Sequence, residues 1–256
     1  MNFAIPIRDI FIGLMVITRV TGLITMVPFF ASRSISSQLR GAMIIGIGVL
    51  LYPLVAWNGD LPSNLIAWVL SMGKELLVGL IMGMAVRMVF FLVEFSGNLI
   101  MEESGLVRSD SFDPINSTKT STLSTLLFYL ATLMFFILQI DHEMLLALVK
   151  SYQYAPIGFT KEGIGGLDTM VKGSAQVFLI SMKMAAPVIA INFTVMMTFS
   201  IMGKAAPKID VFSTSFAVRI VVGCSMLIFT FGLISRYLYD QITIVPENML
   251  RFLLNY

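Results

Sequence analysis

Apolar residues occur along this chain in long blocks separated by shorter polar stretches. Four blocks contain no charged side chain, and two contain internal charges. The uncharged blocks are Gly41–Gly59, Ser121–Ile140, Met184–Gly203 and Ile220–Ser235, and the charged ones are Ile10–Ala31 and Leu65–Val93. A helix needs roughly 20 apolar residues to cross the hydrocarbon core of a bilayer. The pattern therefore predicts an all-α polytopic membrane protein with about six hydrophobic helical segments.

Three prolines, Pro28, Pro53 and Pro187, stand inside these blocks. Proline lacks the amide hydrogen that a helix interior uses, and its ring clashes with the preceding turn. In membrane proteins, neighbouring helices can satisfy the backbone groups that a break leaves unpaired. We therefore expect some of the six segments to be broken.

The composition supports a membrane location and argues against other classes. Hydrophobic residues make up 57% of the 256 residues and charged residues 12%, whereas a soluble domain usually has about 25% charged residues. The 17 basic residues are dispersed, so nucleic-acid binding is not expected. The single cysteine, Cys224, excludes an internal disulfide. With six spans, the loops on the two sides carry equal numbers of Lys and Arg, so the positive-inside rule assigns no orientation.

Several ionisable residues fall inside or beside the apolar blocks. A charged residue at the centre of a lipid-facing helix costs about 2.5–3.5 kcal/mol on insertion scales. We expect these side chains to face protein, water or one another rather than lipid. They are Arg19, Lys74, Glu75, Arg87, Glu94, Lys183 and Arg219.

Charged and small residues share one stripe of the segment that follows Gly73. Glu75, Gly79, Gly83 and Arg87 are spaced four apart and form a ridge on a helix. Gly79 and Gly83 also form a GxxxG motif, which permits close approach of a second helix. This seam packs either inside the chain or against another subunit, and both interpretations stay open. The residues assigned to it are Lys74, Glu75, Gly79, Gly83, Arg87 and Glu94.

The sequence predicts no catalytic residues, no metal site and no cofactor. His142 is the only histidine, and side chains at Asp141, His142 and Glu143 would point in three directions on a helix. The glycine-rich run Gly163–Gly166 lacks the Lys-Ser/Thr pair of a phosphate-binding loop. We therefore expect a protein that is not an enzyme.

Short motifs follow one another in order along nearly the whole chain. The first are Thr18-Arg-Val-Thr-Gly-Leu, Pro28-Phe-Phe and Ser32-Arg-Ser, followed by Lys74-Glu75, Gly79, Gly83, Gly97 and Asp113-Pro114. The later ones are His142, Ser151-Tyr-Gln-Tyr-Ala-Pro-Ile-Gly158, Pro187 and Gly203-Lys-Ala-Ala-Pro-Lys-Ile-Asp-Val-Phe212. In order and spacing they resemble the FliR/SctT family, the membrane component of flagellar and virulence type III export gates.

The resemblance implies a single-copy gate subunit in the bacterial inner membrane. It implies FliP-like and FliQ-like membrane partners, FlhA-like and FlhB-like export components, contact with membrane lipid, and unfolded proteins as substrates. The implied fold is like a fusion of the two membrane partners, with a FliP-like part at residues 1–173 and a FliQ-like helical hairpin at residues 174–256. The flagellar system is favoured, and the SctT subunit of a virulence injectisome is the alternative.

The resemblance also implies a loop that plugs the closed pore, at about residues 105–120. Polar turn-forming residues are frequent there, so the stretch is not expected to form a bilayer helix. Without the resemblance, the same composition is typical of a surface loop. The candidate plug residues are Gly105, Leu106, Val107, Phe112, Asp113 and Pro114.

The tip of the C-terminal hairpin is expected at about residues 203–212. Gly203 and Pro207 would end one helix and turn the chain. Lys204 and Lys208 would lie near the last carbonyl groups of that helix, and we expect them to contact acidic groups of neighbouring subunits. The candidate tip residues are Gly203, Lys204, Pro207, Lys208 and Asp210.

A small secondary transporter is the alternative of another class. Its substrate would bind near the bilayer midplane, at Arg87 and Glu94 or at Lys183. A transporter of this kind should show repeated halves and function without partners. No internal repeat is evident in the sequence, so the export-gate interpretation is favoured.

Overall fold

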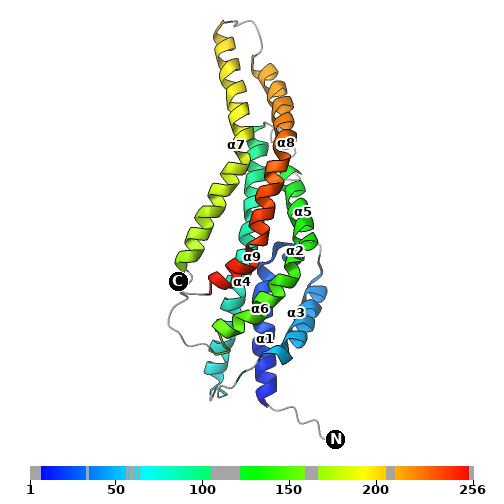
Figure 1. The fold of residues 1–256 in the computed structure, drawn as a ribbon, viewed down its shortest axis with the longest axis vertical. Coiled ribbons are helices and arrows are strands. Elements are labelled where there is room, and N and C mark those ends of the chain that lie inside the picture. Colours follow the sequence, from blue (N-terminus) through cyan, green and yellow to red (C-terminus); the bar gives the residue numbers. More distant parts are fainter. Residues whose placement is uncertain are drawn as a thin grey trace. The chain divides into compact units, whose positions relative to one another are not determined.

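The computed structural model describes residues 7–32, 35–55, 57, 61–62, 64–104, 122–158, 167–205 and 211–253. Within these ranges every regular element is helical, which confirms the all-α prediction. The elements are α1 (Ile7–Met26), α2 (Pro28–Ala31), α3 (Ser37–Leu51), the 3-10 helix η1 (Tyr52–Leu54), α4 (Leu65–Glu103), α5 (Thr122–Ile137), α6 (Ile140–Tyr154), α7 (Leu167–Ala205), α8 (Val211–Thr243) and α9 (Val245–Arg251) (Figure 1).

Among the described residues, five helical segments are long and apolar enough to cross a membrane. The pair α5 and α6 also meets these criteria when it is taken as one span bent by 67°. The protein is therefore an all-α polytopic membrane protein with five or six candidate spans, as predicted. The single-helix candidates are Ile7–Met26, Ser37–Leu54, Leu65–Glu103, Asp168–Ala205 and Ser213–Thr243.

Two of the three prolines coincide with breaks, and the third does not. Pro28 is the first residue of α2, after the extended residue Val27. Pro53 lies in η1, directly after α3 ends at Leu51. Pro187, in contrast, stands inside α7, which continues to Ala205. The expectation that some segments are broken is therefore confirmed at Pro28 and Pro53, whereas Pro187 lies within a continuous helix.

The block Ser121–Ile140 is divided by a break that contains no proline. Gln139 adopts a left-handed conformation with φ 55° and ψ 31°, between the end of α5 and the start of α6. A non-glycine residue in this conformation costs roughly 1–2 kcal/mol. Hydropathy contains no signal for such a break, because the apolar character continues across it.

The long helices exceed the apolar blocks from which they were predicted. Helices α4 and α7 each contain 39 residues, and α8 contains 33. At 1.5 Å per residue these are about 58 Å and about 50 Å long, whereas a bilayer core is about 30 Å thick. Each of these helices therefore has more length than one membrane crossing requires.

Contacts divide the chain into two compact units. Unit 1 comprises Met1–Val89, Phe135–Gly173 and Thr243–Tyr256, and unit 2 comprises Phe90–Met134 and Ser174–Ile242. Helices α4, α5 and α7 therefore contribute residues to both units, and α8 belongs to unit 2 except for its last residue, Thr243. The predicted parts at residues 1–173 and 174–256 refer to likeness to two partner proteins, which is a different criterion, and they stay a prediction.

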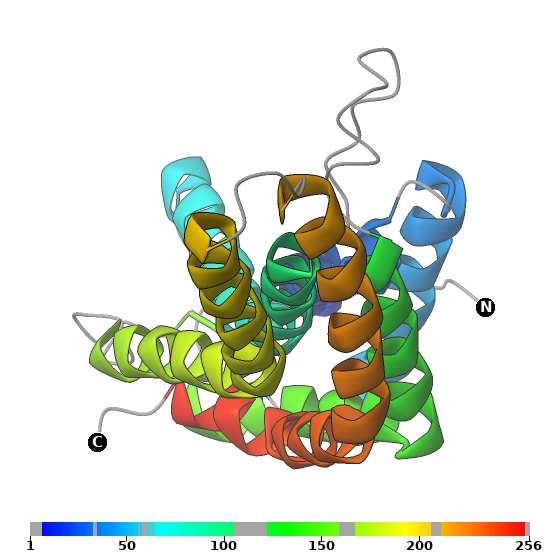
Figure 2. The same ribbon diagram turned by 90° about the horizontal axis from the view of Figure 1, so that it is seen from above.

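Each unit has its own packing. In unit 1, α1 contacts α2 and α3, and α6 contacts α9. In unit 2, the C-terminal part of α4 lies beside α7 and α8, as the view from above shows (Figure 2). Aromatic rings also meet in unit 2, where Phe95 of α4 lies 5.4 Å from Phe178 of α7 between ring centroids. These two helix groups hold the polar residues described next.

Candidate functional site

Arg19 lies in the second half of α1, on the buried face of an apolar helix. Its side chain has no exposed surface, and Met15, Val16 and Val20 beside it are also fully buried. Taking a charged group out of water has an effective cost of several kcal/mol unless partners compensate. The residues around Arg19 must therefore replace its hydration.

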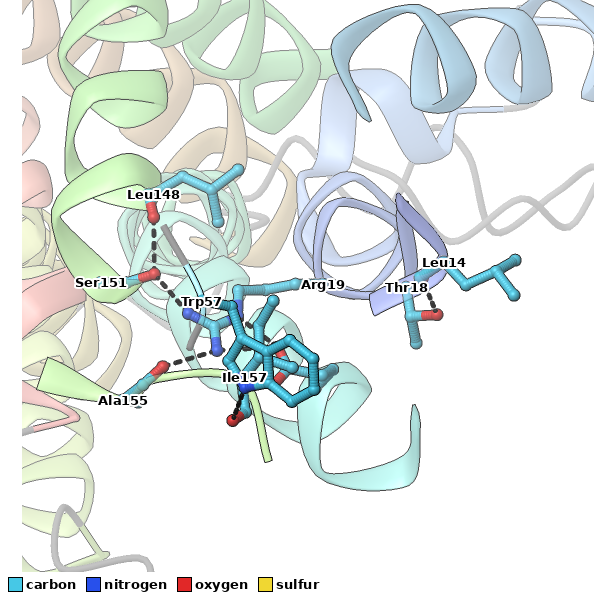
Figure 3. Close-up of polar contacts among 9 residues, drawn as sticks. Leu14, Thr18, Arg19, Trp57, Leu148, Ser151, Ala155 and Ile157 are labelled. Carbon is cyan, nitrogen blue, oxygen red and sulfur yellow. Dashed lines mark hydrogen bonds and ion pairs between the residues drawn. The ribbon is translucent and has the colours of Figure 1, made fainter. Parts of the chain in front are cut away.

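Helix α4 and the end of α6 supply these partners (Figure 3). Oε2 of Glu75 accepts a hydrogen bond from Nε of Arg19 at 2.7 Å and also lies 2.7 Å from Nη2. The Ser151 hydroxyl accepts from Nη1 at 2.9 Å. The carbonyl oxygen of Ala155, directly after α6, accepts from Nη2 at 2.7 Å. Each nitrogen of the guanidinium group thus has a hydrogen-bond partner.

The Tyr152 ring covers one face of the same guanidinium group. The Cζ atom of Arg19 lies 3.8 Å from the ring centroid, and a desolvated cation–π contact of this kind contributes about 2 kcal/mol. We refer to Arg19, Glu75, Ser151, Tyr152 and Ala155 as the Arg19 cluster. All of its members belong to unit 1.

The stretch from Ser151 to Gly158 is held in place by this cluster. The Ala155 N–H donates to the Ser151 carbonyl at 2.8 Å and ends α6. The indole N–H of Trp57 donates to the Ile157 carbonyl at 3.2 Å. Gly158 has φ 79°, a conformation that favours glycine, and its backbone hydrogen-bonds to the Glu75 carboxylate. The motif therefore encodes a helix end and turn that wrap the ion pair.

Glycines bring α1 and α4 into backbone contact beside the ion pair. A Cβ atom added at Gly22 would lie 2.5 Å from the carbonyl oxygen of Leu76, and one at Gly83 would lie 2.6 Å from Cβ of Met26. A Cβ atom at Gly79 would collide with the carbonyl oxygen of Arg19. This close approach lets the Glu75 carboxylate reach the Arg19 guanidinium, as in small-residue packing of membrane helices.

The Arg19 cluster has the properties of a structural ion pair rather than a reactive site. Arg19 and Glu75 are sealed from solvent, with side-chain exposures of 0% and 2%. Their charges compensate each other, so a substrate would find no group available to bind. Across the described residues, no three His, Cys, Asp or Glu side chains form a group that could hold a metal ion. The Arg19 cluster therefore joins α1, α4 and the end of α6.

Unit 2 contains a second polar group whose hydrogen bonding is incomplete. Asn192 of α7 is 1% exposed, and neither atom of its amide has a hydrogen-bond partner. A Cβ atom at Gly223 of α8 would lie 3.0 Å from Nδ2 of Asn192 and 2.8 Å from Oγ of Ser104. Arg219 of α8 donates from Nη2 to the carbonyl of Glu103, and its buried Nε has no partner. We refer to Ser104, Asn192, Arg219 and Gly223 as the Asn192 cluster.

Comparison with known proteins decides the family. The model of a family described as bacterial export proteins, family 1, matches residues 10–244 of this chain. The chain belongs to this family. The predicted membership of the FliR/SctT family is thereby confirmed, and with its candidate spans the protein is a membrane-embedded component of a type III protein export apparatus.

Relatives of this export protein come from flagellar and virulence systems. Flagellar biosynthetic protein FliR of Pectobacterium carotovorum subsp. carotovorum is 26% identical over 221 residues, which cover 84% of this chain and 81% of the relative. Flagellar biosynthetic protein FliR of Bacillus subtilis is 24% identical over 242 residues, 92% of each chain. Yop proteins translocation protein T of Yersinia pestis is 23% identical over 192 residues, 74% of each chain.

Only part of the predicted seam of this export protein is buried. Glu75, Gly79 and Gly83 are buried, and the two glycines contact α1 within the same chain. Lys74 next to Glu75 is exposed, and so are the two later charged members of the seam, Arg87 and Glu94. The buried half therefore packs inside the chain, and the exposed half belongs to its surface.

The predicted hairpin tip is described in part. Gly203 and Lys204 belong to the last turn of α7, and Lys204 is exposed. Helix α8 begins at Val211. Pro207, Lys208 and Asp210 lie outside the described residues. The contacts expected of the two lysines stay a prediction.

The predicted plug lies outside the described residues. Helix α4 ends at Glu103, and the next described helix, α5, begins at Thr122. All six candidate plug residues fall between these helices, within residues 105–121. The plug of this export protein therefore stays a prediction that rests on the resemblance.

Arg19 and Glu75 stand out in the sequence as charges that lipid would reject, but nothing in the sequence pairs them. They are separated by 56 positions, and Ser151 is 132 positions from Arg19, so no local spacing connects them. Asn192 was missed because it is uncharged. The available signal was that three of the recognised motifs together contain the whole Arg19 cluster: the first contains Arg19, the second Glu75, and the third Ser151, Tyr152 and Ala155.

Proposed function

We propose that this export protein is the FliR-type subunit of a flagellar type III export gate in the bacterial inner membrane. In this proposal one copy assembles with FliP-like and FliQ-like subunits and works with FlhA-like and FlhB-like components. Unfolded proteins cross the membrane through the resulting pore. The family match over residues 10–244 supports the proposal, and the uncovered surface of α7 and α8 agrees with it.

The observation that carries the proposed assembly is the low burial of α7 and α8. The most apolar parts of these two candidate spans are 22% and 17% buried, whereas that of α4 is 61% buried; α3, in unit 1, is also little covered, at 11%. Lys183 of α7 is exposed and stands next to the charge-free run Met184–Gly203. Because lipid disfavours a lysine at the centre of a span, protein neighbours or a water-filled pore are better surroundings for this face.

The flagellar system is favoured over a virulence injectisome by the extent of similarity. The FliR relatives from Pectobacterium and Bacillus match 84% and 92% of this chain, and the Yersinia translocation protein matches 74%. The identities are similar, so coverage is the distinguishing quantity. Complementation tests this choice: the gene should restore swimming to a strain that lacks FliR. Restored effector secretion in a strain lacking the translocation protein, without restored swimming, would reverse the assignment.

Co-purification tests the assembly itself. A tagged chain expressed with its genomic neighbours should be recovered in a fixed ratio with two smaller membrane proteins, and it should be unstable without them. The variant Lys183→Gln should reduce recovery of the partners, whereas Lys172→Gln on the same helix should not, since Lys172 already pairs with Asp168 at 2.5 Å. A well-behaved single chain that transports a small solute in liposomes would instead indicate a secondary transporter.

The proposed hairpin tip has its own test. Replacing Lys204 and Lys208 together by alanine should weaken assembly or export, because two positive charges at the end of α7 would lose acidic partners on neighbouring subunits. Export and recovery of the complex at wild-type levels would contradict the proposed contact.

The proposed plug is tested by conductance. Deleting residues Val107–Ser117 should increase the leak of small ions through the assembled gate, because the deleted segment includes Val107, Phe112 and Pro114, which are candidates for filling the lumen. The assembled wild-type gate in the same bilayer is the control. An unchanged conductance, with the complex intact, would contradict a plug at this position.

A further inference from the structure

The C-terminal end of α4 is capped by a side chain from α8. The last carbonyl groups of a helix have no partner within that helix and need one from elsewhere. The carbonyl oxygen of Glu103, the last residue of α4, accepts a hydrogen bond from Nη2 of Arg219. A cation in this position also lies at the negative end of the helix dipole. Arg219 therefore holds the end of α4 against α8, and both residues belong to unit 2.

Ser104, the residue that follows α4, is enclosed beside this cap. Its hydroxyl donates a hydrogen bond to the Ile100 carbonyl at 2.7 Å, and its exposed fraction is 2%. Gly223 lies one turn after Arg219 on α8, where a Cβ atom would be 2.8 Å from Oγ of Ser104 and 3.0 Å from Nδ2 of Asn192. The point at which the chain leaves α4 therefore meets α8 and α7 at the same level.

The Asn192 cluster makes this contact with an incomplete set of hydrogen bonds. Both amide atoms of Asn192 and Nε of Arg219 are buried without a partner among the described residues. A buried polar group in this state has lost its hydration and gained no hydrogen bond in return. When the end of α4 separates from α7 and α8, water reaches these groups and offsets part of the packing that is lost. The contact is therefore easier to open than one whose polar groups are all satisfied.

The position of this contact along the chain gives it a role. Ser104 is directly followed by residues 105–121, which include all six candidate plug residues and lie outside the described residues. Because the chain is continuous, the groups that hold Glu103 and Ser104 also hold the point from which the proposed plug starts.

We propose that the Asn192 cluster is a releasable clamp on the end of α4, through which α7 and α8 control how firmly the proposed plug is held. In the closed clamp, Arg219 caps Glu103, and Ser104 lies against Gly223. In the open clamp, the Asn192 amide and Nε of Arg219 are hydrated and the end of α4 is free to move. The inference rests on the proposed plug and adds the contact that regulates it.

Single-channel recording of the assembled gate in planar bilayers tests this inference. Arg219→Met removes the cap and should raise the open probability about tenfold, because a hydrogen bond from a charged donor contributes at least that factor to an equilibrium. Arg236→Met is the matched control and should leave the open probability unchanged, because Arg236 is an exposed arginine of α8 outside the cluster. Recovery of the partner subunits is measured for each variant.

Asn192→Leu should act in the opposite direction. It removes the unsatisfied amide from the closed contact and should lower the open probability about fivefold. A variant that only damaged the protein would not hold the gate closed, so the opposite signs separate a clamp from a structural defect. If Arg219→Met does not assemble, Asn192→Leu decides the matter by itself. An increased or unchanged open probability in Asn192→Leu would overturn the inference.

Combining Arg219→Met with deletion of residues Val107–Ser117 tests the link to the plug. On the deletion background, Arg219→Met should have no further effect, because the released helix end then carries no plug. An undiminished increase on that background would overturn the inference while the proposed plug stands. An unchanged conductance of the deletion alone, with the complex intact, would contradict the proposed plug and with it the clamp.

Discussion

The two units handle polar side chains inside apolar helices in different ways. In unit 1, Arg19 meets a carboxylate, a hydroxyl, a carbonyl oxygen and an aromatic ring, all from the same chain. In unit 2, the amide of Asn192 and Nε of Arg219 are buried without a partner among the described residues. In unit 1 the only such atom among the described residues is the Tyr152 hydroxyl. The contrast therefore concerns the buried charge: unit 1 satisfies every nitrogen of the Arg19 guanidinium by itself, whereas unit 2 leaves Nε of Arg219 and the Asn192 amide with unmet hydrogen-bonding capacity.

The difference has a physical basis in the cost of desolvation. A buried ion pair is tolerated when geometry is good and the remaining donors are satisfied, and the Arg19 guanidinium meets both conditions. An unsatisfied buried amide costs about 1–3 kcal/mol. Unit 1 should therefore be sensitive to removal of any partner of Arg19, whereas removal of the unpartnered Asn192 amide from unit 2 should leave stability unchanged or increase it.

Removing the carboxylate of Glu75 should have the largest effect. Glu75→Ala leaves the guanidinium buried without its counter-charge, and such a change costs about 3–5 kcal/mol. A large fall in the midpoint of thermal unfolding in detergent, with loss of the monodisperse peak in gel filtration, is the expected outcome. Glu102→Ala is the control on the same helix, because Glu102 is exposed.

The double variant Arg19→Met with Glu75→Leu distinguishes loss of charge balance from loss of packing. It removes both charges and should regain most of the stability, because hydrophobic replacements of a buried pair are often neutral. A double variant as unstable as Glu75→Ala would show that the ion pair itself is required.

Closing the contact between α1 and α4 should have the next largest effect. Gly79→Ala places a methyl group against the backbone of Arg19, and overpacking of this kind typically costs about 1–3 kcal/mol. Gly73→Ala is the matched control on α4, since a Cβ atom there meets no atom within 4 Å. The control should be neutral or stabilising by up to about 1 kcal/mol. Equal midpoints of thermal unfolding for Gly79→Ala and Gly73→Ala would contradict close packing at Gly79.

A smaller loss is expected at the turn that wraps the ion pair. Gly158→Ala forces a side chain into a backbone conformation with φ 79°, at a cost of roughly 1–2 kcal/mol. Gly13→Ala, on a helix and with open space around it, is the comparison variant. The decrease in unfolding midpoint should appear in Gly158→Ala and not in Gly13→Ala; the reverse order would mean that the turn is unstrained.

The smallest effect, and one of opposite sign, is expected in unit 2. Asn192→Leu replaces an unpartnered amide with an apolar group of similar size and should stabilise the chain by about 1 kcal/mol. Asn98→Leu is the matched variant, because Oδ1 of Asn98 accepts a hydrogen bond from the Ser124 hydroxyl at 2.7 Å, and it should destabilise by a similar amount. Both variants are compared by the midpoint of thermal unfolding in detergent. An equal decrease in the two variants would contradict the claim that the Asn192 amide is unpartnered.

Hydropathy predicted the features that a single helix determines by itself. The all-α class, the number of candidate spans and the breaks at Pro28 and Pro53 all follow from apolar block length and proline chemistry. Hydropathy underestimated α7 and α8, because their flanks remain helical after the apolar run has ended. It had no means of locating the left-handed residue Gln139, whose conformation depends on the packing of both adjoining helices.

The pairing of distant residues could not be predicted in the same way. Arg19 and Glu75 are both conspicuous in the sequence, yet seven charges inside or beside the apolar blocks allow many pairings. The glycines of the seam suggested a close helix contact without naming the partner helix. The structure supplies that partner, since Gly79 and Gly83 face α1. The structure thus shows that the buried part of the seam packs inside the chain, which the spacing of glycines along one helix could not decide.

The separation of Arg19 from its partners has a consequence for biosynthesis. When Arg19 is added to the growing chain, Glu75 is still 56 residues from being made, and Ser151 is 132 residues away. At about 5–20 residues per second, the first helix waits roughly 3–11 seconds with an uncompensated guanidinium, which disfavours release into lipid by about 2.5–3.5 kcal/mol. The nascent chain therefore has a reason to remain at the insertion machinery until α4 arrives, so that the two helices enter the membrane as a pair.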